Sequence, residues 1–588
     1  MTQTPRAGFW LIALFVLALR LPFITIAIQG DDYYYLAAAQ HAQVDPAHPL
    51  HARLVFLGDP IDLRGHPHPP GNAWWLAALL MLTRDVRVPL FHALYLLFSL
   101  LAGWSMWRLS TKFVPEARLW ATLLFCAVPA FVVNGTSLEA DVPHLALWMA
   151  AVMLFVERRL VLSVLAMAAA SSFAYQALAL IPILGVYQWL YRRGDRAGWA
   201  VLLTPVLTVG GYQLFERLSS GDLPGTVLAG HMRNYGLQTL AMKAKNAIAL
   251  CGHLTVMMSP LGVIALFKRR IPFLTLWVLI FFAAALVLFF AGSARYLLPL
   301  AAPLAMLTAA QFHNRPALLG AALAFQLALG LSLATVSAQQ WNAYAKAAEW
   351  LPAEPGSSRV WVNAEWGLRY YAEAAGARAV QRGQVLWPGD WLITSDLADR
   401  IPFTTGGGQA LELRSQPIEP VLPLRLIGPG TGSGYSSVIY GLWPFGWSTG
   451  PADTIRLFRV VARAPELSWL PMNAPQTEFQ IVSGVYSLES DKWRWAAARA
   501  DFVLKRPAHP APLVAEVYIP DLAPGRTLRL ELDGKTVLEK TLPAPGQVKL
   551  ETAPLSGERV SLSIDREFQA PGDNRKLGFI LSGIGFRE

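Results

Sequence analysis

The chain carries little charge for its length. Asp, Glu, Lys and Arg make up 15% of its 588 residues, whereas 54% are hydrophobic and the mean hydropathy is +0.38. An ordinary soluble domain carries about 25% charged residues, so this composition argues against a purely cytosolic globular protein. It argues against a disordered chain and a coiled coil for the same reason. The length leaves room for about three or four domains.

Cysteine is also scarce. The two cysteines, Cys126 and Cys251, both lie in or beside apolar stretches, so the sequence shows no disulfide framework. Zinc-ligand spacing is absent too. The chain is therefore not a small disulfide-stapled scaffold or a zinc-finger protein.

Long hydrophobic runs fill the front of the chain, from Phe9 to Val336, while Gln339 to Glu588 has an ordinary soluble composition. The first run, Phe9 to Ile28, is not followed by a small-residue cleavage pattern, so it predicts a retained transmembrane helix. Windows of about 20 residues predict about eleven membrane spans. They are 9–28, 88–109, 119–134, 142–156, 160–173, 175–191, 199–215, 247–267, 273–291, 296–312 and 317–336.

The basic residues predict the orientation of these spans. Lys and Arg number 49 against 39 acids, a net charge of +10 that would suggest nucleic acid in a soluble protein. In a membrane protein the positions of the basic residues matter more than the net charge, because short loops rich in Lys and Arg lie on the cytoplasmic side. This rule predicts a cytoplasmic N-terminus and an extracytoplasmic C-terminal region. Arg84 and Arg87, in the first outer loop, are exceptions. The predicted cytoplasmic residues include Arg108, Lys112, Arg118, Arg158, Arg159, Arg192, Arg193, Arg196, Lys268, Arg269, Arg270 and Arg315.

The C-terminal half predicts two further domains. Strand and helix alternate over 359–395, which indicates an α/β region with Gly/Pro-rich loops over 339–465. Short alternating strands separated by turns then favour a jelly-roll-like β-sandwich over 466–588. Gly406–Gly408 lacks the ending of a phosphate-binding loop and is expected to be an ordinary loop. With residues 1–338 as the membrane domain, three domains are expected.

Two acids follow the first span directly, as Asp31 and Asp32. Carboxylates at a membrane boundary are costly, which makes them functional candidates. A structural alternative is that one of them caps the helix predicted from Tyr33 to Gln43. Both roles are compatible, because adjacent residues on a helix point about 100° apart.

Further polar motifs lie in the predicted outer loops. His66 and His68 precede a Pro pair and two tryptophans, and they are either metal or phosphate ligands or unligated loop residues. Glu139 and Asp141 precede another span, where Asp141 is also explained as a helix cap. Arg295 ends a span, where it either binds phosphate with its planar fork or reaches toward lipid headgroups.

Together and in this order, these motifs resemble the polytopic GT-C glycosyltransferases. The resemblance covers residues 8–336 and is to the branch of protein O-mannosyltransferases, including bacterial dolichyl-phosphate-mannose-protein mannosyltransferases, and aminoarabinose transferases. It is carried by Arg20, Asp31-Asp32-x-x-Tyr35, His68-Pro69-Pro70, Glu139-x-Asp141-x-Pro143 and Arg295-Tyr296-Leu297-Leu298-Pro299.

The resemblance implies roles for these residues. Asp31 would be the catalytic base, and Arg295 with His68 would hold the donor phosphate. His68 departs from the lysine often found in the family. Pro67 stands where one branch has a zinc-binding acid, so no metal is carried over. The residues implied in substrate binding are Asp32, Tyr35, His66, His68, Glu139, Asp141, Arg295 and Tyr296, of which Asp32, Glu139 and Asp141 would position the acceptor or hold a divalent cation.

The sequence thus favours an inner-membrane transferase of bacteria. It would move a sugar from a polyprenyl-phosphate donor to a hydroxyl of a glycan, lipid or protein acceptor on the outer face, with inversion. One carboxylate suffices as base, because the donor already carries a good leaving group. Two alternatives stay open: a transporter or flippase, which would show ionisable residues along a mid-membrane path, and a non-catalytic glycan-binding membrane protein.

Overall fold

The computed structural model describes residues 5–587, apart from 235, 238, 269–270, 353–357, 399, 429, 572 and 574. Arg269 and Arg270 of one predicted cytoplasmic loop lie outside the described residues. The chain divides into two compact units. The first contains 1–54, 60–345 and 418–453, and the second contains 55–59, 346–417 and 454–588. Each is described here by itself.

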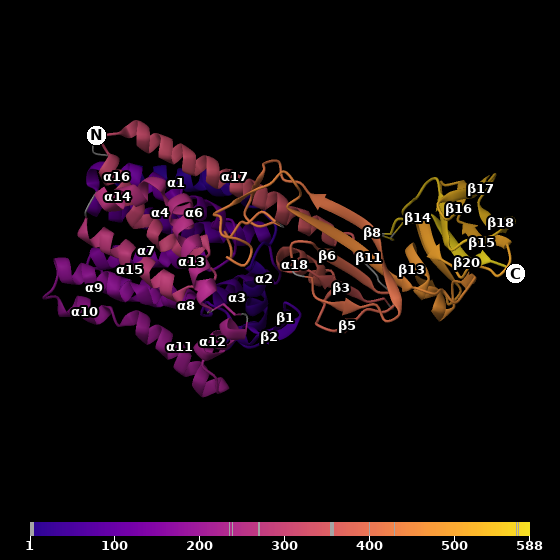
Figure 1. The fold of residues 1–588 in the computed structure, drawn as a ribbon, viewed down its shortest axis with the longest axis horizontal. Coiled ribbons are helices and arrows are strands. Elements are labelled where there is room, and N and C mark those ends of the chain that lie inside the picture. The colour runs from indigo at the N-terminus through magenta and orange to yellow at the C-terminus, as the bar shows by residue number, and fades with distance from the viewer. Residues whose placement is uncertain are drawn as a thin grey trace. The chain divides into compact units, whose positions relative to one another are not determined.

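The first unit is helical, drawn in indigo to magenta in Figure 1. Its apolar core gathers large buried side chains such as Phe125, Trp148 and Trp277. The helices are α1 (Pro5–Arg20), α2 (Asp32–His41), α3 (Gly71–Thr83), α4 (Val88–Phe113), α5 (Arg118–Cys126), α6 (Pro129–Asn134), α7 (Asp141–Val156), α8 (Leu160–Phe173), α9 (Leu180–Tyr191), α10 (Arg196–Val201), α11 (Thr204–Ser220), α12 (Pro224–Asn234), α13 (Leu240–His253), α14 (Pro260–Lys268), α15 (Pro272–Leu288), α16 (Ala301–Phe312) and α17 (Pro316–Ala348).

Membrane-spanning length is reached by fewer helices than the sequence windows predicted. Among the described residues, three helical stretches are long and apolar enough to cross a membrane: 88–113, 196–220 and 316–348. Shorter apolar helices cover 10–23, 71–83, 141–156, 160–173 and 272–288. All eleven predicted spans coincide with helical segments, but the count of eleven and the topology threaded from it stay predictions.

Prolines explain where the predicted spans break. The span expected over 119–134 is two helices, α5 and α6, because Pro129 lacks an amide hydrogen and begins a new helix. The span expected over 247–267 is bent by 98° before Pro260. That bend makes it either one broken span or a re-entrant loop.

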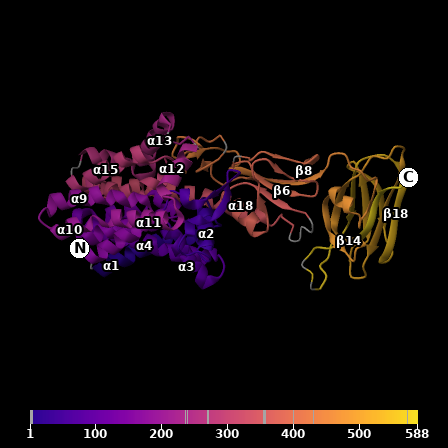
Figure 2. The same cartoon turned by 90° about the horizontal axis from the view of Figure 1, so that it is seen from below.

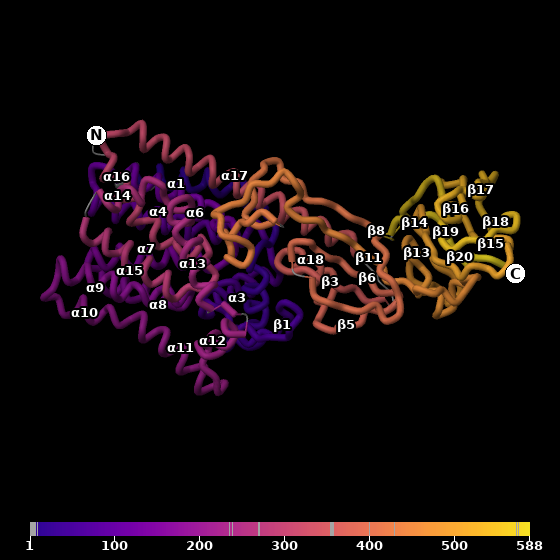
Figure 3. The backbone as a smooth tube through the Cα atoms, in the orientation of Figure 1, coloured from indigo at the N-terminus to yellow at the C-terminus, as the bar shows by residue number. Residues whose placement is uncertain are grey.

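One loop expected in the extracytoplasmic α/β region belongs to the helical unit. Residues 418–453 are grouped with the helices, and Figures 1 and 3 show this orange segment beside α13. His253 of α13 donates from Nε2 to the Gly434 carbonyl at 3.2 Å. Pro444 lies against α13 at Gly252. The loop therefore contributes to the same unit as the motifs of residues 8–336.

The second unit holds two large sheets, drawn in orange to yellow in Figure 1, and a two-stranded sheet of β5 (Gln384–Val385) and β7 (Phe403–Thr404). A five-stranded sheet has the order β4-β3-β6-β11-β8, with β3 parallel to β4 and β6, as expected for an α/β region. Helix α18 (Trp366–Ala374) follows β3. The strands are β3 (Val360–Asn363), β4 (Arg378–Ala379), β6 (Trp391–Ser395), β8 (Gly408–Ile418) and β11 (Asp453–Ala462).

The C-terminal sheet differs from the expected two-layer sandwich. In the described part of the chain, hydrogen bonding is continuous from β17 to β18, and these two end strands lie close together, so the sheet nearly closes into a barrel. Alternating apolar residues of these strands form its core. The strands are β12 (Trp469–Pro471), β13 (Ile481–Glu489), β14 (Trp493–Val503), β15 (Ala511–Ile519), β16 (Thr527–Leu532), β17 (Lys535–Thr541), β18 (Gly546–Leu555), β19 (Arg559–Ile564) and β20 (Phe579–Phe586).

A buried guanidinium fixes the end of the first helix. Arg20 donates to the carbonyls of Val132 and Phe131, at 2.6 Å each, and to the Ser99 hydroxyl at 3.3 Å. A Cβ at Gly135 would overlap its guanidinium, so the glycine makes room for it. Arg20 thereby joins α1 to α4 and α6.

We expect Arg20→Met to destabilise the protein by about 2–4 kcal/mol, because it removes charge-assisted hydrogen bonds and leaves buried carbonyls with fewer partners. Thermal unfolding of the purified protein in detergent measures this change. Lys112→Ala, at an exposed position on α4, is the control. A melting temperature equal to that of the control would contradict the expectation.

Candidate active site

Three carboxylates surround the guanidinium of Arg295. Its Nη2 lies 2.5 Å from Asp31 Oδ2, its Nη1 2.6 Å from Glu139 Oε2, and its Nε 3.7 Å from Asp141 Oδ2. The Arg295 side chain is 13% exposed, and Asp31 is 28% exposed. The structure therefore brings four of the residues predicted from the sequence into one cluster.

Separate segments supply this cluster. Asp31 immediately precedes α2, Glu139 and Asp141 stand at the start of α7, and Arg295 lies in a short 3₁₀ segment, Ala294–Leu300. Gly30 has a φ of +45°, and a Cβ there would lie 2.8 Å from Glu139 Oε1. Glycine is thus required for the close approach of the first loop to Glu139.

The capping alternative is wrong for Asp31. It occupies the N-cap position of α2, but its side chain makes no capping hydrogen bond and instead contacts Arg295. Its backbone N–H donates to Glu139 Oε1 at 3.1 Å. Asp141 is the first residue of α7 and does not cap that helix either. Both carboxylates are therefore directed to the guanidinium.

Asp32 has a different setting from its neighbour. It is fully buried, and its Oδ1 accepts from the Leu138 N–H at 2.7 Å while its Oδ2 accepts from the Gln29 N–H at 3.2 Å. Burial and the nearby charge of Glu139 raise the pKa of Asp32 well above its ordinary value. Asp32 thus joins the loop after the first helix to the loop before α7 and has no surface for an acceptor.

The two histidines lie around Tyr35. The Tyr35 ring centroid is 4.9 Å from that of His66 and 5.9 Å from that of His68. His68 Nδ1 lies 3.1 Å from the Phe173 carbonyl, so this nitrogen carries the hydrogen. Burial lowers the pKa of His66 to about 3 and that of His68 to about 4. His68 is therefore uncharged at neutral pH, and it would not hold the donor phosphate by positive charge.

The carboxylates differ in their tendency to ionise. Burial opposes ionisation of Asp31, but the charge of Arg295 outweighs it, and the pKa of Asp31 falls below its ordinary value. Burial raises the pKa of Glu139 to about 8, against the opposing effect of Arg295. At neutral pH Asp31 is thus the ionised member of this pair, and Glu139 is largely protonated.

The loop 418–453 supports the segment that carries Arg295. The Tyr435 carbonyl accepts from the Ala294 N–H at 2.9 Å and from the Ser293 hydroxyl at 3.0 Å. The Tyr435 hydroxyl accepts from Asn134 Nδ2 at 2.8 Å. Sequence analysis missed Tyr435, because it lies 140 residues after Arg295 in a stretch identified only by its Gly and Pro content.

Aromatic rings complete the cluster. The Arg295 guanidinium carbon lies 5.6 Å from the ring centroid of Tyr296, which is buried, as is Tyr35. In the part of the chain that the structure describes, no group of three or more His, Cys, Asp or Glu side chains is arranged to hold a metal ion. The arrangement combines one ionised base candidate, one permanent cation and neutral hydrogen-bonding groups.

No family model and no curated protein matches the chain. Among solved structures it is similar to ArnT from Cupriavidus metallidurans bound to undecaprenyl phosphate, at 14% identity and a TM-score of 0.43, covering 66% of this chain and 92% of that one. It is similar to the S. cerevisiae protein O-mannosyltransferase Pmt1-Pmt2 complex bound to the sugar donor, at 13% identity and a TM-score of 0.29, covering 39% and 35%. A third is the arabinofuranosyltransferase AftD from Mycobacteria, at 13% identity and a TM-score of 0.36, covering 98% and 58%.

Glu139 should make stability depend on pH. Its pKa of about 8 in the folded protein exceeds the ordinary 4.5, so the folded state binds the proton more tightly than the unfolded state. This contribution is fully present below pH 4.5 and is lost as pH rises through about 8. We expect Glu139→Gln to lose less stability than the wild type between pH 5 and 8, measured as melting temperature in detergent. Parallel pH profiles for the two proteins would contradict this assignment.

Proposed function

We propose that this protein is an integral membrane glycosyltransferase with Asp31 as its general base. It transfers a sugar from a polyprenyl-phosphate donor to an acceptor hydroxyl on the outer face of the inner membrane of a bacterium. The observation that carries the proposal is the ionised, partly exposed Asp31 carboxylate, which is not used as a helix cap and lies against Arg295.

The chemistry needs few groups. Asp31 accepts the proton of the acceptor hydroxyl as its oxygen attacks the anomeric carbon. The bond from that carbon to the phosphate oxygen breaks, and the polyprenyl phosphate leaves with the electron pair. Attack opposite the leaving group inverts the anomeric centre. No acid is needed for the leaving group, which distinguishes this reaction from glycosidic hydrolysis with its two carboxyl groups.

Arg295 is the cation for the donor phosphate in this proposal. A guanidinium binds phosphate through paired hydrogen bonds, and here it is held by carboxylates instead. A phosphate that competes for Nη2 would release Asp31 from its 2.5 Å contact. The pKa of Asp31 would then rise toward its ordinary value, which makes it a stronger base when the donor is in place.

Two polar atoms of the cluster have no hydrogen-bond partner among the described residues, which supports substrate binding beside Arg295. Asp141 Oδ2 and Arg295 Nε are buried and make no hydrogen bond among the described residues. Buried polar atoms are usually satisfied, so an acceptor hydroxyl or a phosphate oxygen is a suitable partner. Protonated Glu139 would donate a hydrogen bond in the same place.

The remaining residues have supporting roles in the proposal. His66, being neutral, would donate one hydrogen bond to the donor rather than attract its charge, whereas His68, whose only N–H is directed to the Phe173 carbonyl, would accept a hydrogen bond from a sugar hydroxyl at Nε2. Tyr35 and Tyr296 would pack against the sugar or the lipid headgroup. Asp32 would hold the two loops together rather than contact the acceptor, because it is fully buried.

Asp31→Asn should lower transfer by about 10²–10⁴-fold, because the amide cannot accept the hydroxyl proton. The assay measures labelled sugar moved from polyprenyl-phosphate donors in membranes. Asp45→Asn, a change of the same kind at a carboxylate that is 42% exposed, is the control. Unchanged transfer by the Asp31 variant would refute the base, and no transfer from any donor by the wild type would favour the transporter or binding alternatives.

Arg295→Gln should move the acid limb of the pH profile of kcat/KM to higher pH. Arg295 lowers the pKa of Asp31, so the wild type keeps its base ionised at lower pH than the variant does. The variant should also have a lower kcat/KM, by about 10–10³-fold, from lost stabilisation of the leaving phosphate. Arg64→Gln, which breaks a pair with Asp62 outside the cluster, controls for general charge loss. An unmoved acid limb would contradict the pairing of Arg295 with Asp31.

A further inference from the structure

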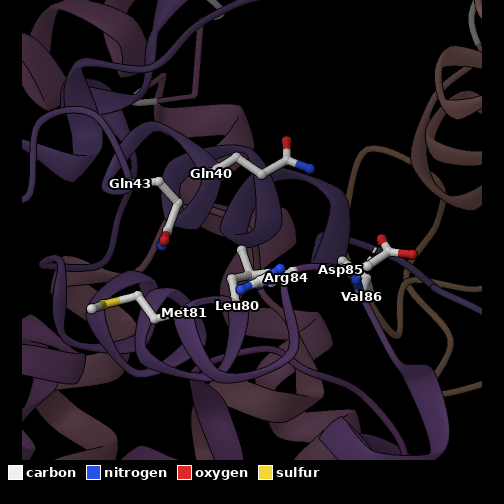
Figure 4. Close-up of a pocket in the computed structure, with 7 residues that line it drawn as sticks. All are labelled: Gln40, Gln43, Leu80, Met81, Arg84, Asp85 and Val86. Atoms are coloured by element: carbon white, nitrogen blue, oxygen red, sulfur yellow. Dashed lines mark hydrogen bonds between the residues drawn. The ribbon is translucent and has the colours of Figure 1, made fainter.

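A second polar site lies at the end of α3, away from the Arg295 cluster. A cavity of about 510 Å³ opens between α2 and the turn that links α3 to α4. Figure 4 shows Gln40 and Gln43 on one side and Met81, Leu80 and Arg84 on the other. Asp85 and Val86 complete the lining, and Figure 2 shows α2 and α3 as neighbours. A cavity of this size is within the usual range for small ligands.

Arg84 has an unusual backbone at this cavity. Its φ is +62°, the left-handed conformation in which glycine is normally found after a helix. Strain of this kind, in a residue that is not glycine, is concentrated at functional sites. The strained backbone of Arg84 therefore makes its side chain a candidate ligand-binding group.

The guanidinium is available to a ligand. In the described part of the chain neither Arg84 nor Arg87 has a carboxylate within ion-pair distance, whereas Arg64, in the same predicted outer loop, pairs with Asp62 and Asp222. The Asp85 carboxylate accepts from the Val86 N–H at 2.7 Å, and Figure 4 shows it directed away from the Arg84 side chain. Arg84 also makes no side-chain hydrogen bond to the α3 carbonyls among those residues, so stabilisation of the helix end does not account for it.

Exposed apolar side chains lie beside Arg84 in the sequence and continue along α4, a candidate membrane span. Met81 and Leu82 on α3 are 74% and 82% exposed, and Leu90 and Leu97 on α4 are also exposed. Helix α4 is long and apolar enough to cross a membrane, and it begins four residues after Arg84. Exposed side chains of this kind face lipid chains in a membrane protein. Arg84 and Arg87 stand just before the first residue of this helix, and they are the exceptions to the positive-inside rule.

We propose that this cavity binds the phosphate headgroup of an anionic membrane lipid. The Arg84 guanidinium would bind the phosphate oxygens, while the Gln43 amide keeps its hydrogen bonds to the Ala39 and Ala77 carbonyls and forms part of the cavity wall. The acyl chains would lie over Met81 and Leu82. A phosphate group attached to an apolar tail fits both the free arginine and the exposed apolar residues beside it.

Lipid titration of the purified protein, followed by native mass spectrometry, tests this site. We expect phosphatidylglycerol to bind about tenfold more tightly than phosphatidylcholine, a difference typical of one charge-assisted contact. Arg84→Gly should abolish the preference while the melting temperature stays equal or rises, because glycine suits a φ of +62°. Arg84→Lys should keep part of the preference. Arg53→Gln, at another exposed arginine, should keep all of it.

Three results would overturn the proposal. The first is an unchanged preference for phosphatidylglycerol in a folded Arg84→Gly variant. The second is equal binding of the two lipids by the wild type. The third is inorganic phosphate binding at Arg84 as tightly as the lipid, which would mean that the ligand is free phosphate. The outcome is independent of sugar transfer, since Arg84 lies outside the Arg295 cluster.

Discussion

The candidate site depends on the contacts between the Arg295 guanidinium and the carboxyl groups around it. A buried cation needs anionic partners, because removing it from water is costly. The carboxyl groups of Asp31, Glu139 and Asp141 surround it, from two loops that are more than 100 residues apart in the sequence, and Asp31 keeps its negative charge. Because the partners come from separate segments of the chain, their contacts with Arg295 also hold these loops together.

Excess negative charge decides how the cluster ionises. Three carboxylates around one cation cannot all ionise cheaply in a buried site, and the contrast between Asp31 and Glu139 follows from this. The carboxylate with greater exposure and the short contact to Arg295 keeps its charge, and the more buried one binds a proton. An ionised and a protonated carboxyl group thereby lie within one cluster of similar side chains.

Support for Arg295 comes from a part of the chain that looks unimportant in the sequence. The Gly/Pro-rich loop of 418–453 packs within the helical unit and meets the segment of Arg295 through Tyr435. Its glycines allow close backbone approaches: a Cβ at Gly441 would lie within 2 Å of the Gly432 carbonyl oxygen. The loop's low complexity therefore reflects tight packing of backbone.

Local chemistry in the sequence determined much about this protein. Runs of apolar residues predicted where helices lie, and alternation predicted strands, because both patterns depend on residues close together in the chain. The polar motifs pointed to Asp31, Glu139, Asp141 and Arg295. Only the tertiary structure decided that these four meet, that Asp31 is not a cap, that His68 is neutral, and that the last strands form one nearly closed sheet. Those properties depend on burial and on partners that are distant in the chain, which no local pattern contains.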